Sequence, residues 1–433
     1  MIEIIPLKKP IPAEIKAPPS KAHSLRAFFI AGLAEGKSIL KNPLLAEDQM
    51  HALKALKEFG IKSEIKKDKV IIIGTGGRLQ LPKEIINVGN SGVTARFLAS
   101  FASLAPKGKI VIDGGKRMRE GRPIQDLIGA LNQVGVKIKS IYGNGCLPIE
   151  IEGGTFEGGK AELKGEISSQ YFSSILISAP YAKKDTSIKC LGEMSSRPYI
   201  DITLQMMADF GVLTKHSQYK KFFVKTPQKY HSRNLTLEGD WTNVSYFLAA
   251  TAICSGRIKV KNLRLDSVQG DKIFADLLKK MGCQLIKKQN QVELISKGNL
   301  KSIKRIDMNS YPDLAPTLAV ISAFAQGQTE IYHIAHLRFK ECDRIKALVK
   351  ELKKIGVEVK ERKDGLVIKP NKDNLHGGVI DCYNDHRMAM AFSIAGLKIP
   401  GIIIKNEKCV KKSFVDFYQV FKKIGGNYKF LAP

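Results

Sequence analysis

Charged residues that could bind an anion and move a proton are concentrated in the segment HLRFKECDRIKAL, residues 336–348. This segment places Lys340, Glu341, Asp343 and Arg344 close together in the chain. Two kinds of cation beside a carboxylate suit an anionic substrate whose reaction transfers a proton. The same pattern also occurs as local ion pairs at the solvated start of a helix, so the rest of the sequence has to decide between these interpretations.

The residues after Arg344 predict the element that holds these charges. Apolar side chains recur at Ile345, Leu348, Leu352 and Ile355, which is the spacing of a helix with one buried face. The charged residues are therefore expected at the first turn of a rigid amphipathic helix.

An amphipathic helix that ends at a glycine and is followed by a strand occurs six times in the chain. Glycine at this position lets the backbone turn left-handed as it leaves the helix. The six glycines are Gly60, Gly135, Gly211, Gly282, Gly356 and Gly425. By subtraction, their separations are 75, 76, 71, 74 and 69 residues. Such a regular period predicts six small α/β units, because self-similarity at a fixed spacing marks a repeated supersecondary structure.

The predicted fold is α/β, with two similar domains of three repeat units each. A chain of 433 residues is long for one core, which favours two domains. The break is expected near the midpoint, at the segment LEGDWTN of residues 237–243. We expect the first domain to span residues 19–238 and the second to combine residues 1–18 with 239–433.

Composition indicates a globular protein. The chain is 44% hydrophobic and 26% charged, and no apolar run reaches the length of a membrane span. Its first eighteen residues lack the continuous apolar segment of a secretory signal. The seven cysteines are scattered without a CxxC pair, which argues for reduced thiols in the cytoplasm and against a zinc site or a disulfide framework.

The formal net charge of +29 points to an anionic partner, and a nucleic acid is one candidate. Lysines are spread along the whole chain, however, and no basic tail or stacked-aromatic RNA motif is present. We interpret most of the charge as a lysine-rich surface with a local excess at a site. A basic nucleic-acid-binding protein built on the same repeat would explain the charge, but it would not explain Asp313 and Glu341.

Candidate anion-binding residues also recur at expected helix starts and in glycine-rich loops. They are Lys21 and Arg26; Gly92, in a tight loop that opens a helix; Arg122, in a basic glycine-rich loop; Ser168, Ser169 and Gln170; Ser196 and Tyr199; Asp313; Arg387; and Lys412. A helix cap or a surface loop explains each one alone, but together they predict a cleft that binds one or two small anions. We expect no metal and no organic cofactor, because no zinc ligand set, Walker A motif or dinucleotide-binding fingerprint is visible.

Nine segments of the chain resemble the 5-enolpyruvylshikimate-3-phosphate synthase family. They are SKAHSLRA, GNSGVTAR, RMREGRPI, SSQYFSS, SRPYIDIT, EGDWTNVSYFLAA, YPDLAPTLA, RFKECDR and YNDHRMAM, which follow the family's order. The resemblance implies two domains of three βαβαββ units each, with the active site in the interdomain cleft. It also implies transfer of the enolpyruvyl group of phosphoenolpyruvate to the 5-hydroxyl of shikimate 3-phosphate, with release of phosphate from a tetrahedral intermediate. The implied enzyme is a cytoplasmic monomer with small-molecule partners only, neither nucleic acid nor membrane.

The resemblance also implies roles for individual residues. The implied catalytic residues are Lys21, Asp313 and Glu341, with Asp313 as the base for the 5-hydroxyl and Glu341 as the group that protonates the methylene carbon together with Lys21. Those implied for phosphoenolpyruvate are Lys21, Gly92, Arg122, Gln170, Arg344, Arg387 and Lys412. Those implied for shikimate 3-phosphate are Lys21, Ala22, Arg26, Ser168, Ser169, Gln170, Ser196, Tyr199, Asp313, His336 and Lys340.

The chain departs from the family's pattern at a few of these segments. Ala22 stands in place of serine, Val93 in place of threonine and His336 in place of asparagine, and Gly121 is an additional residue in RMREGRP. The additional residue leaves Arg119 as an alternative to Arg122. A sister enzyme family that uses UDP-N-acetylglucosamine as acceptor is the second candidate. It needs a cysteine in the glycine-rich loop, where this chain has none; the nearest is Cys146.

Overall fold

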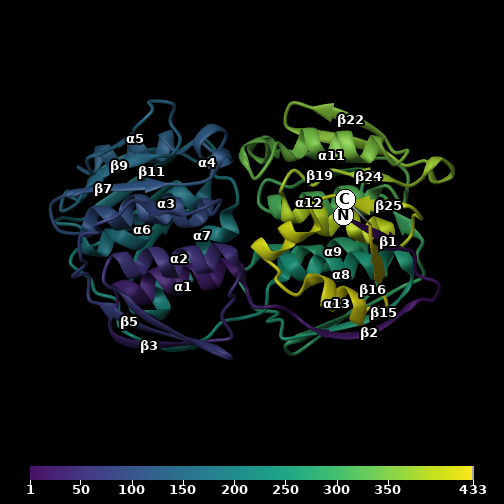
Figure 1. Ribbon diagram of the computed structural model, residues 1–433, viewed down its shortest axis with the longest axis horizontal. Coiled ribbons are helices and arrows are strands. Elements are labelled where there is room, and N and C mark those ends of the chain that lie inside the picture. Colours follow the sequence, from purple (N-terminus) through teal and green to yellow (C-terminus); the bar gives the residue numbers. More distant parts are fainter. Residues whose placement is uncertain (432–433) are drawn as a thin grey trace. The chain divides into compact units, whose positions relative to one another are not determined.

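A computed structural model describes residues 1–431, and these divide into two compact units. The first unit is residues 19–237, and the second combines residues 1–18 with the chain from residue 238 onward. Figure 1 colours the chain by residue number, so that the two units can be followed separately. Within residues 1–431, no helix has both the length and the apolar character needed to cross a bilayer.

The first unit contains three four-stranded sheets, each with two helices. One sheet has the strand order β14 (Asn234–Thr236), β3 (Glu35–Lys41), β5 (Lys69–Thr75) and β4 (Lys62–Lys66), with helices α1 (Lys21–Leu33) and α2 (Glu47–Glu58). The next has β6 (Ile86–Asn87), β7 (Lys109–Asp113), β9 (Ile149–Glu152) and β8 (Ile138–Ser140), with α3 (Gly92–Phe101) and α5 (Gln125–Gln133). The third has β10 (Gly159–Lys164), β11 (Thr186–Leu191), β13 (Lys221–Val224) and β12 (Thr214–Ser217), with α6 (Ser169–Ser178) and α7 (Arg197–Asp209).

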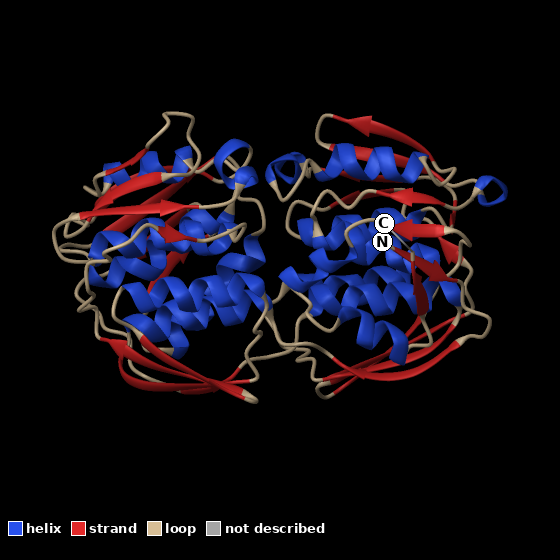
Figure 2. Cartoon of the chain, in the orientation of Figure 1, coloured by secondary structure: helices blue, strands red, loops and turns tan. Residues whose placement is uncertain are grey.

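The second unit repeats this plan, and Figure 2 shows the helices and strands of both. Its first sheet has β2 (Ile11–Lys16), β15 (Gly256–Lys261), β17 (Gln291–Ser296) and β16 (Gln284–Lys288), with α8 (Trp241–Cys254) and α9 (Ile273–Lys280). The next has β19 (Arg305–Asp307), β21 (Thr329–Tyr332), β23 (Gly365–Lys369) and β22 (Glu358–Arg362), with α10 (Ala315–Ser322) and α11 (Arg344–Lys353). The third has β24 (Gly378–Ile380), β25 (Ile402–Ile404), β1 (Ile2–Ile5) and β26 (Asn427–Phe430), with α12 (His386–Gly396) and α13 (Phe417–Lys423).

Each sheet combines parallel and antiparallel pairing in the same way. The first two strands run parallel, as in β10 and β11, where Gly159 pairs with Thr186. The remaining strands run antiparallel, as in β11 and β13, where Thr186 pairs with Val224. A parallel pair needs a crossover, which the first helix of the repeat supplies in four of the sheets, as α6 does between β10 and β11. The result is a βαβαββ unit, and the predicted fold class of two similar domains with three such units each is confirmed.

Three strands reach their sheets from distant parts of the chain. β14 follows the third repeat but pairs with β3 of the first, where Asn234 lies opposite Ile39. β2 lies near the amino terminus but pairs with β15, where Ile11 lies opposite Gly256. β1 lies between β25 and β26, so Ile2 has a partner on both sides. In each unit, at least one sheet therefore contains a strand that is far in sequence from the strands it pairs with.

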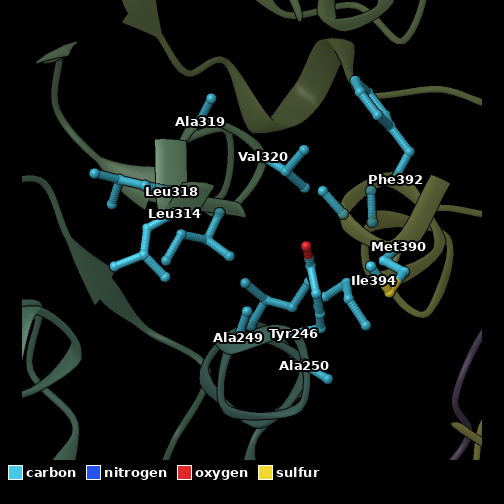
Figure 3. Packing of buried hydrophobic residues seen from close by; sticks show 14 of the residues in the cluster. Tyr246, Ala249, Ala250, Leu314, Leu318, Ala319, Val320, Met390, Phe392 and Ile394 are labelled. Atoms are coloured by element: carbon cyan, nitrogen blue, oxygen red, sulfur yellow. The ribbon is translucent and has the colours of Figure 1, made fainter. Parts of the chain in front are cut away.

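The first helix of each repeat is buried almost all round, whereas the second is amphipathic. Every residue of α12 is buried, and so are all but one residue of α8. Figure 3 shows this core in the second unit, where Tyr246 of α8 and Leu318 of α10 point into the same packed region as Met390 of α12. A helix that is apolar on all faces is stable only inside a core. In such a helix, only the ends remain accessible for chemistry.

The six repeat glycines lie where the second helix of each repeat ends. All of them have left-handed backbone angles, with φ between +83° and +102°. The predicted left-handed turn from helix to strand is therefore confirmed at all six positions, which are Gly60, Gly135, Gly211, Gly282, Gly356 and Gly425.

Substituting alanine at Gly282 and Gly356 separates the cost of the left-handed backbone from that of steric overlap. A Cβ atom at Gly282 would meet only the Asn299 carbonyl oxygen, at 3.7 Å, so Gly282→Ala should cost about 1–2 kcal/mol for the backbone angle alone. A Cβ atom at Gly356 would lie 1.8 Å from the Asn374 carbonyl oxygen. We expect Gly356→Ala to cost about 1–3 kcal/mol more, measured by urea denaturation of each variant beside the wild type. Equal costs would contradict the predicted overlap.

Candidate active site

Many predicted site residues lie in the first turn of a repeat's first helix, directly after the residue that caps it. Ser168 Oγ accepts a hydrogen bond from the Gln170 backbone N–H at 3.3 Å, at the start of α6. Asp385 Oδ1 accepts one from the Arg387 backbone N–H at 2.9 Å, at the start of α12. Backbone N–H groups at a helix start lack intrahelical partners and carry partial positive charge, so these turns favour anions.

Arg344 is the centre of a buried group of charges in the second unit. Its side chain is only 1% exposed. Nε donates to Asp385 Oδ2 at 2.7 Å, and Nη1 donates to Asp313 Oδ1 at 3.0 Å. Nη2 donates to Glu341 Oε2 at 2.9 Å. One guanidinium group thus joins the cap of α12, the turn before α10 and the turn before α11.

Two further cations complete the arginine cluster, which we define as Asp313, Glu341, Arg344, Asp385, Arg387 and Lys412. Arg387 Nη2 donates to Asp313 Oδ2 at 2.6 Å, and its Nη1 donates to the Tyr246 hydroxyl at 3.3 Å. Lys412 Nζ donates to Glu341 Oε1 at 3.0 Å. Three cations therefore balance three carboxylates, which is what makes burial of so many charges tolerable.

The charges in the arginine cluster keep one another ionised. Burial would raise the pKa of Asp313, but Arg387 and Arg344 outweigh it and hold that pKa well below its usual range. Burial would lower the pKa of Arg344, but Asp385 and Glu341 outweigh it and raise that pKa above its usual value. Asp313 in this arrangement is a weak base, and Arg344 is permanently charged.

His336 and Lys340 flank the cluster on the segment just before α11. His336 lies in the short 3-10 helix Ala335–Phe339, and Lys340 follows directly. The His336 side chain is buried, and its Nε2 has no hydrogen-bond partner within residues 1–431. Burial, and then the charge of Lys340, lower the pKa of His336 to about 3. His336 is therefore a neutral imidazole at physiological pH.

In the first unit, Lys21 begins α1 and is held by an acidic partner. Its Nζ lies 2.7 Å from Asp48 Oδ2, near the start of α2. Gln49 Nε2 donates to the Lys21 backbone carbonyl at 3.2 Å. The Lys21 ammonium group is thus fixed in place at the beginning of a buried helix.

Arg26 is fully buried and braces α1 against α7. Its Nε donates to Thr203 Oγ1 at 2.7 Å, and its Nη2 donates to the Tyr199 carbonyl oxygen at 2.9 Å. Nη1 donates to the carbonyl oxygen of Ala22 at 3.1 Å. Burial lowers the pKa of Arg26 to about 10, so the guanidinium stays charged at neutral pH. Ser173 of α6 joins the same network through Thr203, at 2.7 Å.

Arg122 lies against the glycine at the start of α3. A Cβ atom at Gly92 would overlap the Arg122 guanidinium, at 2.3 Å from Nη2. Arg122 Nη1 donates to the Asn90 carbonyl oxygen at 3.2 Å, and the side chain is buried. Arg119, at the end of α4 (Lys116–Glu120), is exposed and forms a bidentate pair with Asp113. Of these two arginines, Arg122 is the one that lies beside the glycine loop.

The start of α6 is linked to the same region. Arg96 Nη1 donates to Gln170 Oε1 at 2.8 Å, and its Nη2 lies 3.5 Å from the Pro123 carbonyl oxygen. The Tyr171 hydroxyl donates to that carbonyl at 2.6 Å. The structure therefore brings the turn that follows Arg122 together with the start of α6.

The remaining predicted residues of the first unit occupy nearby helix starts. Ser168 and Ser169 are buried at the beginning of α6. Ser196 precedes α7 with a left-handed backbone, φ +56°, and Tyr199 lies in the first turn of that helix. These residues share the helix-start setting of Gln170, while Ala22 contributes its backbone carbonyl to Arg26.

The sequence and the fold were compared with known proteins. Residues 6–421 match the family model described as EPSP synthase (3-phosphoshikimate 1-carboxyvinyltransferase). A 3-phosphoshikimate 1-carboxyvinyltransferase of Methanosphaera stadtmanae is 43% identical, covering 95% of this chain and 96% of that protein. One from Trichormus variabilis is 38% identical, covering 98% and 99%. A solved structure of EPSP synthase from Acinetobacter baumannii superposes with a TM-score of 0.82 at 27% identity, covering 99% of each chain.

The chain belongs to the EPSP synthase family. The matched name describes an enzyme, a transferase of the carboxyvinyl (enolpyruvyl) group, and the resemblance found in the sequence is confirmed. The alternative acceptor, UDP-N-acetylglucosamine, is not favoured by these matches.

Cys146 agrees with this assignment. Cys146 is buried, and burial raises the pKa of its thiol. A buried thiol that stays protonated is a poor nucleophile or acid at this position.

Sequence reasoning did not identify the partners that hold the predicted residues. Asp48 is the partner of Lys21, and Asp385 is the main partner of Arg344. Both are acidic residues near the start of a helix, where a capping or dipole role is the ordinary expectation. Their contacts join segments that are far apart in the chain, which no local spacing reveals.

The buried His336 should make stability depend on pH. In the unfolded chain a histidine binds a proton near pH 6.5, whereas the folded state resists protonation until about pH 3. The neutral, buried His336 therefore stabilises the folded state fully above pH 6.5. As the pH falls from 6.5 towards 3, the free energy of unfolding decreases by up to about 1.4 kcal/mol per pH unit. Between pH 6 and pH 4, the free energy of unfolding of wild type should fall more steeply than that of His336→Asn.

The measurement is urea denaturation of both proteins across this pH range. Between pH 7 and pH 8 the two curves should run parallel, which serves as the internal control. Parallel curves down to pH 4 would show that His336 is protonated in the folded state as easily as in the unfolded one.

Proposed function

We propose that the chain transfers the enolpyruvyl group of phosphoenolpyruvate to the 5-hydroxyl of shikimate 3-phosphate and releases phosphate. The family match over residues 6–421 supports this reaction. The observation that carries the proposal is the arginine cluster, because it gathers fixed cations and carboxylates at the starts of buried helices. Fixed cations suit the carboxylate and phosphate of such substrates, and carboxylates suit the proton transfers.

The proposed phosphoenolpyruvate ligands are the residues that the family's motifs imply. They are Lys21, Gly92, Arg122, Gln170, Arg344, Arg387 and Lys412. In the structure the three cations of the second unit are neutralised by carboxylates of the cluster. We propose that the anionic groups of the substrate compete for these donors and take over some of their hydrogen bonds.

That exchange would change the basicity of Asp313. Its pKa is held low because Arg387 and Arg344 donate to it. Once substrate anions share those donors, the proton affinity of Asp313 rises, and it becomes able to accept the proton of the 5-hydroxyl. The arginine cluster would thus couple substrate binding to activation of the base.

The remaining steps balance around the methylene carbon of phosphoenolpyruvate. The 5-oxygen of shikimate 3-phosphate bonds to C2 while C3 receives a proton, which gives the tetrahedral intermediate. The C2–O bond to phosphate then breaks as C3 loses a proton, and the enolpyruvyl double bond is restored. We assign the transfers at C3 to Glu341 together with Lys21, by their positions in the family's motifs. Glu341 is held at 3.0 Å from Lys412 Nζ, which would keep its carboxylate oriented.

The proposed ligands of shikimate 3-phosphate are Lys21, Ala22, Arg26, Ser168, Ser169, Gln170, Ser196, Tyr199, Asp313, His336 and Lys340. Hydroxyl and amide groups at helix starts would bind its phosphate and ring hydroxyls. His336 would do so as a neutral imidazole, because its pKa is about 3. We further propose that the enzyme acts as a monomer. We also propose that it acts in the cytoplasm, which the free state of all seven cysteines supports.

The first test is phosphate release from phosphoenolpyruvate with purified protein. Wild type should release phosphate with shikimate 3-phosphate and not with UDP-N-acetylglucosamine. Glu341→Gln should lower kcat by about 10²–10⁴-fold, since a proton-transferring carboxylate is lost while its size is kept. Turnover with neither acceptor, from protein that is folded by circular dichroism, would sink the proposal.

A matched pair of variants tests which arginine binds phosphoenolpyruvate. Arg122→Lys should raise the KM for phosphoenolpyruvate about 10-fold or more, because lysine cannot replace a guanidinium that packs on Gly92. Arg119→Lys changes an exposed residue that pairs with Asp113, and it should change that KM less than 2-fold, a bound that follows from the small energy of exposed pairs. The reverse order of effects would transfer the role to Arg119.

A further inference from the structure

The turn that presents Asp385 to Arg344 takes an unusual backbone path. Tyr383 has φ +51° and Asn384 has φ +55°, so two consecutive residues other than glycine are left-handed. Side chains with a Cβ atom rarely adopt this conformation, and it persists only where the surroundings hold it. The groups that hold this turn therefore help to decide where the carboxylate of Asp385 lies.

Glu351 of α11 is the main group that holds the turn. It is fully buried, and it lies seven residues after Arg344, on the same face of the helix two turns later. Its Oε1 accepts a hydrogen bond from the Tyr383 hydroxyl at 2.7 Å. Its Oε2 accepts from the Asp381 backbone N–H at 3.0 Å and from Lys354 Nζ at 2.6 Å. One carboxylate thus contacts both the beginning and the middle of the turn.

Shorter contacts within the turn pass this constraint on to Asp385. The Tyr383 backbone N–H donates to Asp381 Oδ1 at 2.8 Å, and the Asp385 backbone N–H donates to the Cys382 carbonyl oxygen at 2.7 Å. The Asp385 carboxylate accepts hydrogen bonds from Arg344 Nε at 2.7 Å and from the Arg387 backbone N–H at 2.9 Å. Helix α11 is therefore attached to the turn at two points, through Arg344 at its first residue and through Glu351 two turns later.

We propose that Glu351 and Tyr383 are positioning residues for the transfer reaction. They fix the turn so that Asp385 holds the guanidinium of Arg344 in the orientation that substrate binding requires. Neither residue belongs to the arginine cluster, and both act through Asp385. The inference rests on the proposed function, since it concerns the same arginine cluster. A misplacement of a binding group by a fraction of an ångström is enough to lower turnover.

The kinetic test removes single hydrogen bonds. Tyr383→Phe deletes the hydroxyl bound to Glu351, and Glu351→Gln removes the charge while keeping the size. Each should lower kcat/KM for phosphoenolpyruvate about 10-fold. The matched control is Tyr230→Phe, which removes a buried hydroxyl that donates to the Ile177 carbonyl oxygen at 3.0 Å in the first unit. It should leave kcat/KM within 2-fold of wild type, even if its melting temperature falls as much as that of Tyr383→Phe.

A double-mutant cycle provides a readout that needs no activity. Unfolding is measured for wild type, Tyr383→Phe, Asp385→Asn and the double variant. If Tyr383 positions Asp385, the effect of Asp385→Asn on the unfolding equilibrium constant should be at least about 3-fold smaller when Tyr383 is already phenylalanine. Additive effects, or kinetics of Tyr383→Phe equal to those of Tyr230→Phe, would overturn the inference. A wild type without turnover would overturn the proposed function instead, and the cycle would then decide the positioning role by itself.

Discussion

Burial of the Arg344 guanidinium is the constraint on which the second unit depends. A cation that is 1% exposed is tolerable only if it has partners, and here each of its nitrogens has a carboxylate oxygen within 3.0 Å. Removing one partner of such a buried group typically costs about 3–5 kcal/mol, because the charge that remains is uncompensated. The fold must therefore bring the segments that carry Asp313, Glu341 and Asp385 together around Arg344.

The βαβαββ repeat explains why the candidate residues lie at helix starts. Helices such as α8 and α12 are enclosed by other elements, so a polar side chain along their length would be buried without water. Their first turns are the places where backbone N–H groups and side chains can reach a ligand. Repeating the unit multiplies such turns, and different copies carry different residues there, as Gly92, Gln170 and Arg387 show.

The fold was more predictable from the sequence than the contacts of the site. The repeat was visible because the second helix of each unit ends at a residue with a positive φ. Glycine tolerates this conformation best, so Gly60 and Gly356 mark the helix ends in the sequence itself. The charged segment around Glu341 was visible because its charges are adjacent in sequence. Asp48 and Asp385 were not recognised as partners, because the pairs they form span long stretches of chain and depend on the packing of whole helices. Likewise, the apolar pattern of α1 gives no sign that Arg26 donates to Thr203.

The pairing of strands that are far apart in sequence has a consequence for folding during synthesis on the ribosome. Residues 19–237 include every strand of their three sheets, so this unit can fold while the rest is still being made. β1 and β2 emerge first, yet β1 pairs with strands that end at Phe430 and β2 pairs with β15. At about 5–20 residues per second, β1 waits roughly 20–80 s for its last partner. During that interval β1 has no partner strand, and its apolar residues, such as Ile2 and Ile4, are exposed. An unpaired apolar strand promotes aggregation, so this part of the nascent chain has to be protected.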